Sequence, residues 1–298
     1  MTVKIRGVLT AIVTPFDPAG EVCPQRLRAQ VQRQVKYGNG IFCNGTNGEF
    51  FVLSLEEKLL VTETCVNEVG GKVPVVAHIG EISTRSTINL GKAVAAMGVN
   101  AVSVISPFFV PLKQSELIYH YSAIADAVPV PVYLYNIPAR TGNTIEPATA
   151  AKLAEHPNII GIKDSAGSYE SLKGFLDAAR DIPHFDVLSG PDHLAHQGFV
   201  DGCSACISGL ANVSPEGVSL IWKHFRDGNL EKSKAAQDFI SALRKDLYAV
   251  AFAPAAVKKA AVLLGEDVGE SRYPIRFSEQ DLATIKDVAA KYGTAPAL

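Results

Sequence analysis

Short apolar runs rich in β-branched residues recur along the chain at intervals of roughly 20–35 residues, with helical patterns between them. Several runs are almost continuously apolar, as strands buried on both faces of a sheet are. We predict eight strands, at Val8–Val13, Gly40–Asn44, Val73–His78, Ala101–Ile105, Val132–Tyr135, Ile159–Lys163, Asp186–Ser189 and Ser204–Ser208. Strands that alternate with helices are typical of βαβ units and a parallel sheet.

Amphipathic segments lie between several of these strands. The segment Leu55–Val69 follows Ser54, with Glu57 three residues after that serine, which is a capping-box pattern. Further helices are predicted over Thr84–Met97, Ser115–Ala127, Ser168–Ala179 and Pro191–Val200. Eight strands alternating with helices favour a closed (β/α)₈ TIM barrel. Because periodicity does not report closure, a doubly wound open sheet is the structural alternative.

The pattern changes after Ser208, where strands cease. Helices are predicted over Pro215–Phe225, Leu230–Val250, Ala255–Leu264 and Ser278–Lys291. The first of them would complete the barrel. We therefore predict a barrel over residues 1–225 and a C-terminal helical extension over residues 226–298. No low-complexity linker separates the two, so the extension is expected to pack on the barrel.

Composition fits a single globular α/β barrel of 298 residues, with 47% hydrophobic and 19% charged residues. The net charge of −2 and the lack of a long basic run give no reason to expect nucleic acid or an anionic membrane as a partner. No stretch of about 18 apolar residues and no signal-peptide pattern is present, so no membrane span is expected. Five scattered cysteines favour a reducing, cytoplasmic setting.

Lys163 ends the predicted sixth strand, in the sequence Ile159-Ile-Gly-Ile-Lys-Asp-Ser165. A lysine buried there is costly to keep charged, and the neutral amine is a nucleophile toward carbonyl groups. Catalytic residues of barrels sit at the C-terminal ends of strands. The alternative is that Lys163 lies beyond the strand and pairs with Asp164 in solvent.

Two further strand ends carry polar groups. Gly45-Thr46-Asn47-Gly48-Glu49 follows the second strand, and its glycines allow a turn that directs backbone N–H groups at an anion such as a carboxylate. A plain β-to-α turn would have the same composition. Tyr135 ends the fifth strand and could transfer protons, although it could equally be a packing residue. Arg140 offers two parallel donors to a carboxylate.

Two other clusters of polar residues do not predict a catalytic or metal site. Cys203-Ser-Ala-Cys206 has the spacing of a redox motif, but it lies in an apolar strand and not at a helix N-terminus, so thiol chemistry is not expected. Asp192, His193 and His196 could suggest a metal site. No thiolate or carboxylate cluster completes a ligand set, and a solvated or capping role is expected instead.

The motifs occur together in one known family. Gly7-Val-Leu-Thr-Ala-Ile-Val-Thr-Pro-Phe16, Gly45-Thr-Asn-Gly-Glu49, Tyr135-Asn-Ile-Pro-Ala-Arg-Thr-Gly142 and Gly161-Ile-Lys-Asp164 resemble those of the dihydrodipicolinate synthase and N-acetylneuraminate lyase family. The family also includes 2-keto-3-deoxy sugar acid aldolases and 4-hydroxy-2-oxoglutarate aldolase. The match runs from Gly7 to about Pro274 with the same order and spacing.

The resemblance implies a homotetramer of barrels that needs no cofactor and no metal. It implies that Lys163 forms an imine with pyruvate or another 2-keto acid and that Tyr135 moves the proton to and from the 4-hydroxyl group. It also implies that Thr46 is catalytic and that the backbone amides of Thr46 and Asn47 hold the carboxylate. The carbonyl of Ile207 would face the lysine. By the same resemblance, the remaining substrate contacts are Arg140, Ser165, Gly190, Asp192, Ser208 and Phe109.

Several positions depart from the lysine-pathway synthases. Those enzymes usually have Pro-Tyr-Tyr after the fourth strand, and the second tyrosine extends a proton relay into a neighbouring subunit. This chain has Pro107-Phe108-Phe109, and Phe109 has no hydroxyl. The pair Thr46-Asn47 replaces Thr-Thr, as in 4-hydroxy-2-oxoglutarate aldolases. Arg140 argues in the other direction, since in the synthases this arginine binds the carboxylate of aspartate semialdehyde.

The leading hypothesis is a lyase that cleaves a 4-hydroxy-2-keto acid, such as a 2-keto-3-deoxy sugar acid, to pyruvate and an aldehyde. The first alternative is 4-hydroxy-tetrahydrodipicolinate (dihydrodipicolinate) synthase, and the second is a 2-keto-3-deoxy acid dehydratase. A non-catalytic binding protein is disfavoured because Lys163, Tyr135 and Thr46 are all present. A metal-dependent aldolase is disfavoured because the sequence lacks a ligand cluster.

Overall fold

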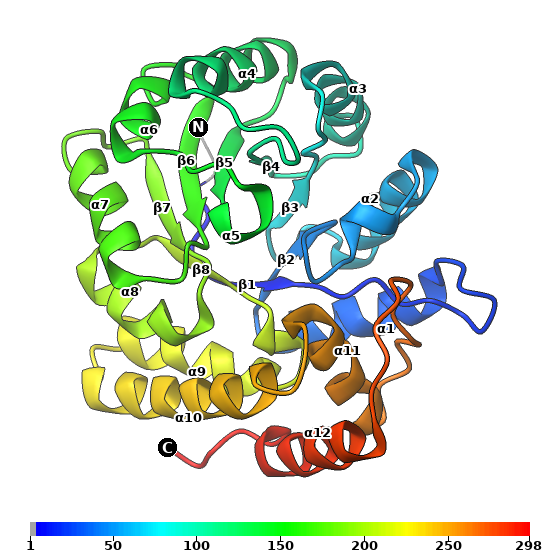
Figure 1. The fold of residues 1–298 in the computed structure, drawn as a ribbon. Coiled ribbons are helices and arrows are strands. Elements are labelled where there is room, and N and C mark those ends of the chain that lie inside the picture. The colour runs from blue at the N-terminus through cyan, green and yellow to red at the C-terminus, as the bar shows by residue number, and fades with distance from the viewer. Residues whose placement is uncertain (1–3) are drawn as a thin grey trace. The chain divides into compact units, whose positions relative to one another are not determined.

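A computed structural model describes residues 4–298. Its strands follow one another in chain order in a closed barrel, and the pairings described between neighbours are parallel. The predicted (β/α)₈ barrel is confirmed, and the open-sheet alternative is wrong. The strands are β1 (Gly7–Ala11), β2 (Gly40–Cys43), β3 (Val75–His78), β4 (Ala101–Ile105), β5 (Val132–Asn136), β6 (Ile159–Asp164), β7 (Asp186–Ser189) and β8 (Ala205–Ser208), labelled in Figure 1.

The predicted strand ends differ from the observed ones by at most two residues. After β1, the Ile12 N–H still donates to the Phe42 carbonyl at 3.1 Å, so pairing continues past the formal end. At β2 the difference has a steric cause. Asn44 has φ 55°, in the left-handed region, and therefore cannot continue the strand. Its side-chain amide is held by the Lys58 carbonyl at 3.0 Å and the Thr62 hydroxyl at 2.9 Å.

The helix over Leu55–Val69 is confirmed in full, with the Ser54–Glu57 capping box. The segment predicted as one helix over Pro191–Val200 is instead a 3-10 turn followed by a short helix. The helices are α1 (Pro24–Val35), α2 (Leu55–Val69), α3 (Thr84–Ala95), α4 (Gln114–Ala127), α5 (Pro138–Thr141), α6 (Pro147–Leu153), α7 (Tyr169–Ala179), α8 (Ala195–Asp201), α9 (Pro215–Arg226), α10 (Leu230–Tyr248), α11 (Ala253–Leu263) and α12 (Glu279–Tyr292), with 3-10 turns η1 (Phe50–Val52), η2 (Asp192–Leu194) and η3 (Leu210–Asn212).

Three helices, α1, α5 and α6, were not predicted. In α1 the buried face contains two glutamines, Gln30 and Gln34, beside Leu27 and Val31. Gln34 is satisfied by the Thr10 hydroxyl at 2.7 Å and the Ala211 carbonyl at 2.9 Å, so it can be buried without a penalty. Because polar residues share the buried face of α1, the pattern of apolar residues in the sequence did not predict this helix. The helices α5 and α6 are four and seven residues long, too short to show a period.

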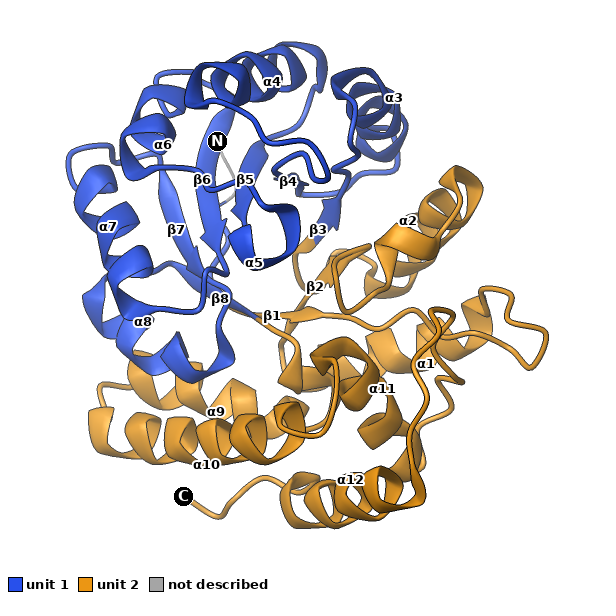
Figure 2. Ribbon diagram, in the orientation of Figure 1, with its two compact units in different colours: residues 1–6, 76–207 blue, residues 7–75, 208–298 orange. Residues whose placement is uncertain are grey.

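The chain divides into two compact units, coloured separately in Figure 2. Unit 1 comprises the N-terminal residues up to Arg6 and Val76–Ile207, and unit 2 comprises Gly7–Val75 and Ser208–Leu298. Unit 1 contains β4 to β7 and α3 to α8, whereas unit 2 contains β1, β2, α1, α2 and the helices from α9 onward. The boundary after residue 225 remains a prediction.

Within unit 2 the C-terminal helices contact one another. The Ser233 hydroxyl of α10 donates to the Ile221 carbonyl of α9 at 2.8 Å. The Tyr292 hydroxyl of α12 donates to Asp246 of α10 at 2.7 Å, and its ring meets Phe239 edge-on with centroids 5.3 Å apart. No helix within residues 4–298 is both long and apolar enough to cross a bilayer.

We expect His120 in α4 to make the stability of the fold sensitive to acid. Its ring is buried, Nδ1 lies 2.9 Å from the Thr84 hydroxyl of α3, and burial lowers its pKa from 6.5 to about 4. Between those values the unfolded chain binds a proton that the folded chain does not. The free energy of unfolding should therefore fall by up to about 3 kcal/mol as pH drops from 6.5 to 4.

Urea denaturation of the wild type and His120→Gln at pH 7 and pH 4.5 measures this effect. The loss of stability on acidification should be smaller in the variant. An equal loss in both proteins would mean that His120 does not carry the acid sensitivity.

Candidate active site

Lys163 and Tyr135 lie side by side at the C-terminal ends of β6 and β5. The two residues are direct partners in the parallel register. Both side chains are buried, and the lysine Nζ lies 3.9 Å from the centre of the tyrosine ring. Lys163 lies inside β6, and Asp164 after it is fully buried, so the solvent-exposed ion pair considered from the sequence is wrong. An amine against an aromatic face is shielded from bulk water.

Asn136 ties the same two strand ends together. Its side-chain amide donates to Asp164 Oδ1 at 2.8 Å, and its Oδ1 accepts the Ile145 N–H at 3.0 Å. Burial raises the pKa of the Asp164 carboxyl, and the hydrogen bond from Asn136 opposes that rise. We did not single out Asn136 from the sequence, although it directly follows Tyr135 in the quoted motif. Its role is to hold the strands that carry the lysine and the tyrosine.

His78 is a further buried residue beside Tyr135 that the sequence analysis missed. Its ring meets the tyrosine ring edge-on, with centroids 5.9 Å apart. The Ile105 N–H donates to His78 Nε2 at 3.4 Å, which assigns the ring proton to Nδ1. A single histidine inside an apolar strand gives no pattern that would mark it as part of a site.

Ser165 and Gly190 are adjacent just beyond the ends of β6 and β7. The Gly190 N–H donates to the Asp164 carbonyl at 2.8 Å, and the Ser165 N–H donates to the Asn136 carbonyl at 2.8 Å. A β-carbon on Gly190 would lie 2.0 Å from the Ser165 hydroxyl and 2.6 Å from the Asp164 carbonyl. Only glycine fits this close approach, so two predicted substrate contacts are brought next to the lysine strand.

The other predicted residues of unit 1 differ in exposure. Ile207 in β8 is buried. Asp192 in η2 is also buried, which corrects the solvated role expected for it. Arg140 is exposed in the last turn of α5. Phe109 is 91% exposed and has φ 77°, a strained conformation for an aromatic residue.

Unit 2 contains the Gly45–Glu49 loop, where Thr46 and Asn47 are half-buried. The loop is closed by the Glu49 N–H, which donates to the Thr46 carbonyl at 3.1 Å. The Asn47 amide packs against Gly209, where an added β-carbon would lie 2.8 Å from its Nδ2. Ser208, the preceding residue, is buried, and its hydroxyl accepts the Ala211 N–H at 3.1 Å. Asn47 and Ser208 therefore lie close together within this unit.

The cysteine pair is placed as expected for structural residues. Cys203 precedes β8 and Cys206 lies in it, and both are buried. Burial raises the pKa of Cys203 to about 12 and raises that of Cys206 further. None of the five cysteines forms a disulfide within residues 4–298. Thiols so strongly protonated are poor nucleophiles at neutral pH.

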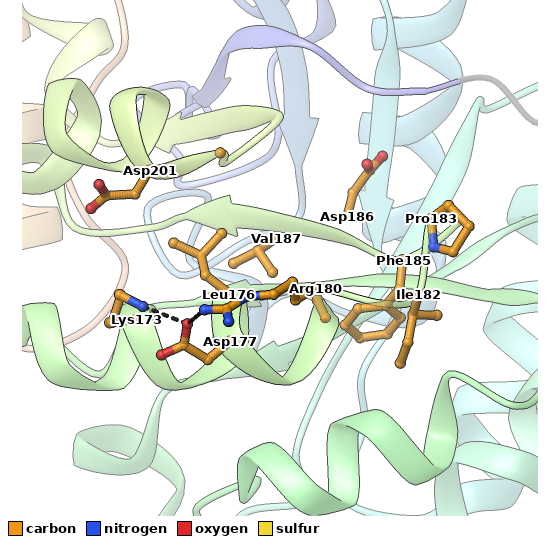
Figure 3. Close-up of a pocket in the computed structure, with 12 residues that line it drawn as sticks. Lys173, Leu176, Asp177, Arg180, Ile182, Pro183, Phe185, Asp186, Val187 and Asp201 are labelled. Carbon is orange, nitrogen blue, oxygen red and sulfur yellow. Dashed lines mark hydrogen bonds and ion pairs between the residues drawn. The ribbon is translucent and has the colours of Figure 1, made fainter.

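A surface cavity of about 480 Å³ lies in unit 1 (Figure 3). It is lined in part by Asp186 and Val187 at the start of β7 and by the ion pairs that Asp177 makes with Lys173 and Arg180. The starts of barrel strands form the face concerned with stability, and the catalytic face is at their ends. None of the predicted site residues lines this cavity.

Buried Lys163 beside Tyr135 on adjacent strand ends is the arrangement expected from the resemblance. Residues 4–291 match the model of the Dihydrodipicolinate synthetase family. The chain belongs to this family. The family contains pyruvate-dependent lyases of the class I aldolase type, so the chain is a carbon–carbon lyase.

Relatives and solved structures agree with the family. An uncharacterized DapA-like lyase of Halobacterium salinarum is 36% identical over 97% of this chain and 94% of its own length. The 4-hydroxy-tetrahydrodipicolinate synthase of Syntrophus aciditrophicus is 36% identical over 97% of this chain and 98% of its own. The crystal structure of dihydrodipicolinate synthase from Acinetobacter baumannii, complexed with pyruvate, has a TM-score of 0.92 and 32% identity, covering 97% of this chain and 99% of that one.

Proposed function

We propose that this enzyme cleaves a 4-hydroxy-2-keto acid to pyruvate and an aldehyde through an imine on Lys163. The observation that carries the proposal is the buried Lys163 amine against the Tyr135 ring at paired strand ends. The neutral form of such an amine attacks a carbonyl carbon. The complex of an Acinetobacter baumannii relative with pyruvate supports a 2-keto acid as the substrate.

The proposed reaction begins when the Lys163 amine adds to the keto carbon and water leaves, which gives a protonated imine. Tyr135 gives its hydroxyl proton to the departing water as the imine forms, and its phenolate then takes the proton of the 4-hydroxyl group as the C3–C4 bond breaks. The bonding electrons pass into the imine, which becomes an enamine, and the aldehyde departs. Protonation of the enamine at C3 and hydrolysis then release pyruvate and restore the free amine. The protein supplies every group that this sequence needs, so neither a metal nor a cofactor is invoked.

By the family resemblance, backbone groups at Thr46 and Asn47 hold the carboxylate next to the keto carbon, and the Thr46 hydroxyl joins the proton transfer. The Ile207 carbonyl would face the amine, and Ser165, Gly190, Asp192 and Ser208 would contact the rest of the substrate.

Synthesis of 4-hydroxy-tetrahydrodipicolinate from pyruvate and aspartate semialdehyde is the second candidate. Arg140 favours it, since an exposed guanidinium can receive a second carboxylate. Several relatives carry the name of that synthase. Phe109 disfavours it, because a phenyl ring cannot extend a proton relay. A dehydratase that uses the same imine is a third candidate.

We also propose that the enzyme is a cytoplasmic homotetramer that does not bind nucleic acid or membranes. Phe109 supports assembly with a second copy, because an aromatic side chain that is 91% exposed at φ 77° combines apolar exposure with backbone strain. Both costs are compensated when such a residue packs into a neighbouring subunit.

Borohydride reduction in the presence of pyruvate tests the imine. A stable adduct should form on the peptide that contains Lys163, and Lys163→Met should abolish it because the only competent amine is gone. Lys173→Met, which removes an exposed lysine of α7, serves as the control and should label normally. Mass spectrometry of the digested protein locates the adduct. Labelling at another lysine, or unchanged labelling of Lys163→Met, would exclude the mechanism.

Tyr135→Phe removes the hydroxyl but keeps the ring under the amine. Turnover should fall by about 10²–10⁴-fold, the usual contribution of a general acid–base group, while imine trapping with pyruvate is affected less. Tyr133→Phe, two residues earlier in β5, is the matched control and should retain most activity. Steady-state rates and trapping rates separate the two effects, and near wild-type turnover in Tyr135→Phe would rule out its role.

Arg140→Ala separates the two leading substrates. If the far end of the substrate is anionic, loss of the charged hydrogen bond should lower kcat/KM by at least about tenfold, whereas a neutral polyol substrate should react almost as before. The measurement compares pyruvate release from sugar-derived and dicarboxylic 2-keto acids, with Arg180→Ala as an exposed-arginine control. Equal efficiency on every acidic substrate would remove Arg140 from the site.

A further inference from the structure

Unit 2 contains a buried ion pair that takes no part in the proposed reaction. Lys258 of α11 and Glu49, which follows the Thr46-Asn47 turn, are both 1% exposed, and Lys258 Nζ lies 2.8 Å from Glu49 Oε1. The same ammonium donates to the Thr14 carbonyl at 2.8 Å and lies 3.9 Å from the centre of the Phe16 ring. The pair joins a C-terminal helix to the loop after β2.

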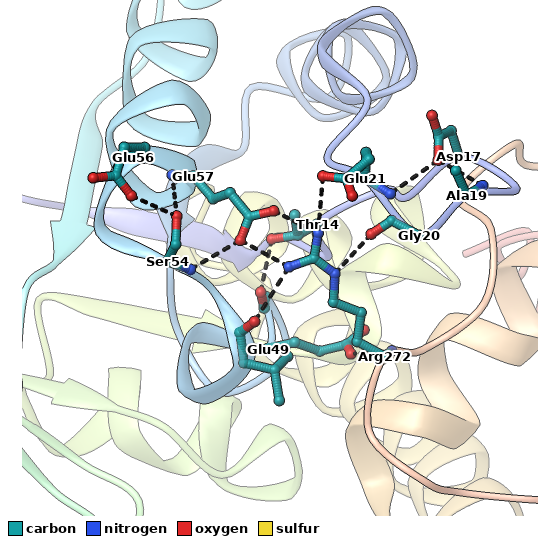
Figure 4. Close-up of polar contacts among 12 residues, drawn as sticks. Thr14, Asp17, Ala19, Gly20, Glu21, Glu49, Ser54, Glu56, Glu57 and Arg272 are labelled. Atoms are coloured by element: carbon teal, nitrogen blue, oxygen red, sulfur yellow. Dashed lines mark hydrogen bonds and ion pairs between the residues drawn. The ribbon is translucent and has the colours of Figure 1, made fainter.

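Glu49 is held from a second side. Its other oxygen, Oε2, accepts the backbone N–H of Arg272 at 2.9 Å. The Arg272 guanidinium in turn donates to Glu57 at 2.7 Å and to the Gly20 carbonyl at 2.7 Å, as Figure 4 shows. Both carboxylate oxygens of Glu49 are therefore fixed by residues from the C-terminal part of the chain.

These contacts act on the backbone of the Gly45–Glu49 loop. Glu49 has φ 58°, a left-handed conformation that a glutamate adopts only when its surroundings impose it. The carbonyl of the preceding Gly48 accepts the Thr14 hydroxyl at 2.7 Å. Thr14 thus contacts the loop through its side chain and Lys258 through its carbonyl, so the three residues form one closed network around the loop.

A buried ion pair of this kind is seldom the most stable choice. The cost of desolvating two charges often exceeds their attraction, and apolar residues of similar volume can replace such pairs without loss of stability. Burial lowers the pKa of Lys258 to about 8, because the loss of hydration outweighs the attraction of the ammonium to Glu49. The burial of this ion pair beside a strained loop therefore points to a role in fixing the geometry of that loop.

We propose that Lys258 and Glu49 are positioning residues that fix the Gly45–Glu49 loop for the carboxylate of the 2-keto acid. The inference rests on the proposed function, in which backbone groups at Thr46 and Asn47 bind that carboxylate. Loss of the pair should shift the loop and weaken carboxylate binding, while the amine of Lys163 should keep its intrinsic reactivity.

Pyruvate-dependent borohydride trapping distinguishes these effects. In Lys258→Met, the pyruvate concentration for half-maximal trapping should rise at least about tenfold, with the maximal trapping rate at saturation within about threefold of the wild type. Because Lys258→Met leaves Glu49 charged and buried, the same measurement is made on Glu49→Gln and on the double variant Lys258→Met/Glu49→Gln. The double variant carries no uncompensated charge and keeps an acceptor for the Arg272 N–H.

The neighbouring Lys259 provides a matched control. It pairs with the exposed Glu270, so Lys259→Met should trap pyruvate like the wild type. Hydrogen exchange gives a readout that does not depend on activity: the Glu49 and Phe50 amides, bonded to the Thr46 and Gly45 carbonyls, should exchange faster in the Lys258 and Glu49 variants only.

The outcomes separate the two proposals. No trapping on Lys163 in the wild type would overturn the proposed function. Hydrogen exchange of the loop amides would then be the remaining test of the positioning role of Lys258 and Glu49. Unchanged half-maximal concentrations in folded variants, or a parallel loss of maximal rate and affinity, would overturn the inference. Unchanged loop exchange in all variants would do the same.

Discussion

The parallel register of β5 with β6 is the constraint on which the candidate chemistry depends. It makes Tyr135 the direct partner of Lys163 and Asn136 the partner of Asp164. Since side chains alternate between the faces of a strand, a slip of one residue would turn the lysine or the tyrosine to the opposite face. The Asn136–Asp164 hydrogen bond at 2.8 Å opposes such a slip from within the barrel. The Lys163 amine is thus oriented by strand pairing.

The chain buries two lysines in different surroundings. Lys163 lies against the face of an aromatic ring, while Lys258 lies between a carboxylate, a backbone carbonyl and a ring. An amine that attacks a carbonyl must be able to lose its proton, and an amine that holds a loop in place benefits from keeping it. The two purposes proposed for these lysines therefore call for different neighbouring groups, and the neighbours of Lys163 and Lys258 do differ.

Much of the barrel could be predicted because its strands are short, apolar and regularly spaced, and because a lysine at the end of such a strand is conspicuous. What escaped prediction has a common physical cause. Gln30 and Gln34 are buried because their amides find partners across the fold, so the buried face of α1 is only partly apolar. Asp192 is buried for reasons that local sequence does not show. Lys258 and Glu49 are 209 residues apart, and the local sequence around each residue gives no sign that the two form a pair.

The contacts of Glu49 also bear on how this chain can vary over evolutionary time. Thr14, Glu49, Lys258 and Arg272 come from four separate stretches of sequence but share one network. A chain recombined from two relatives with a crossover anywhere between positions 50 and 257 would inherit the loop from one parent and its anchors from the other. The helices after β8 and the first two strands are therefore expected to change together, as one inherited block that is discontinuous in sequence.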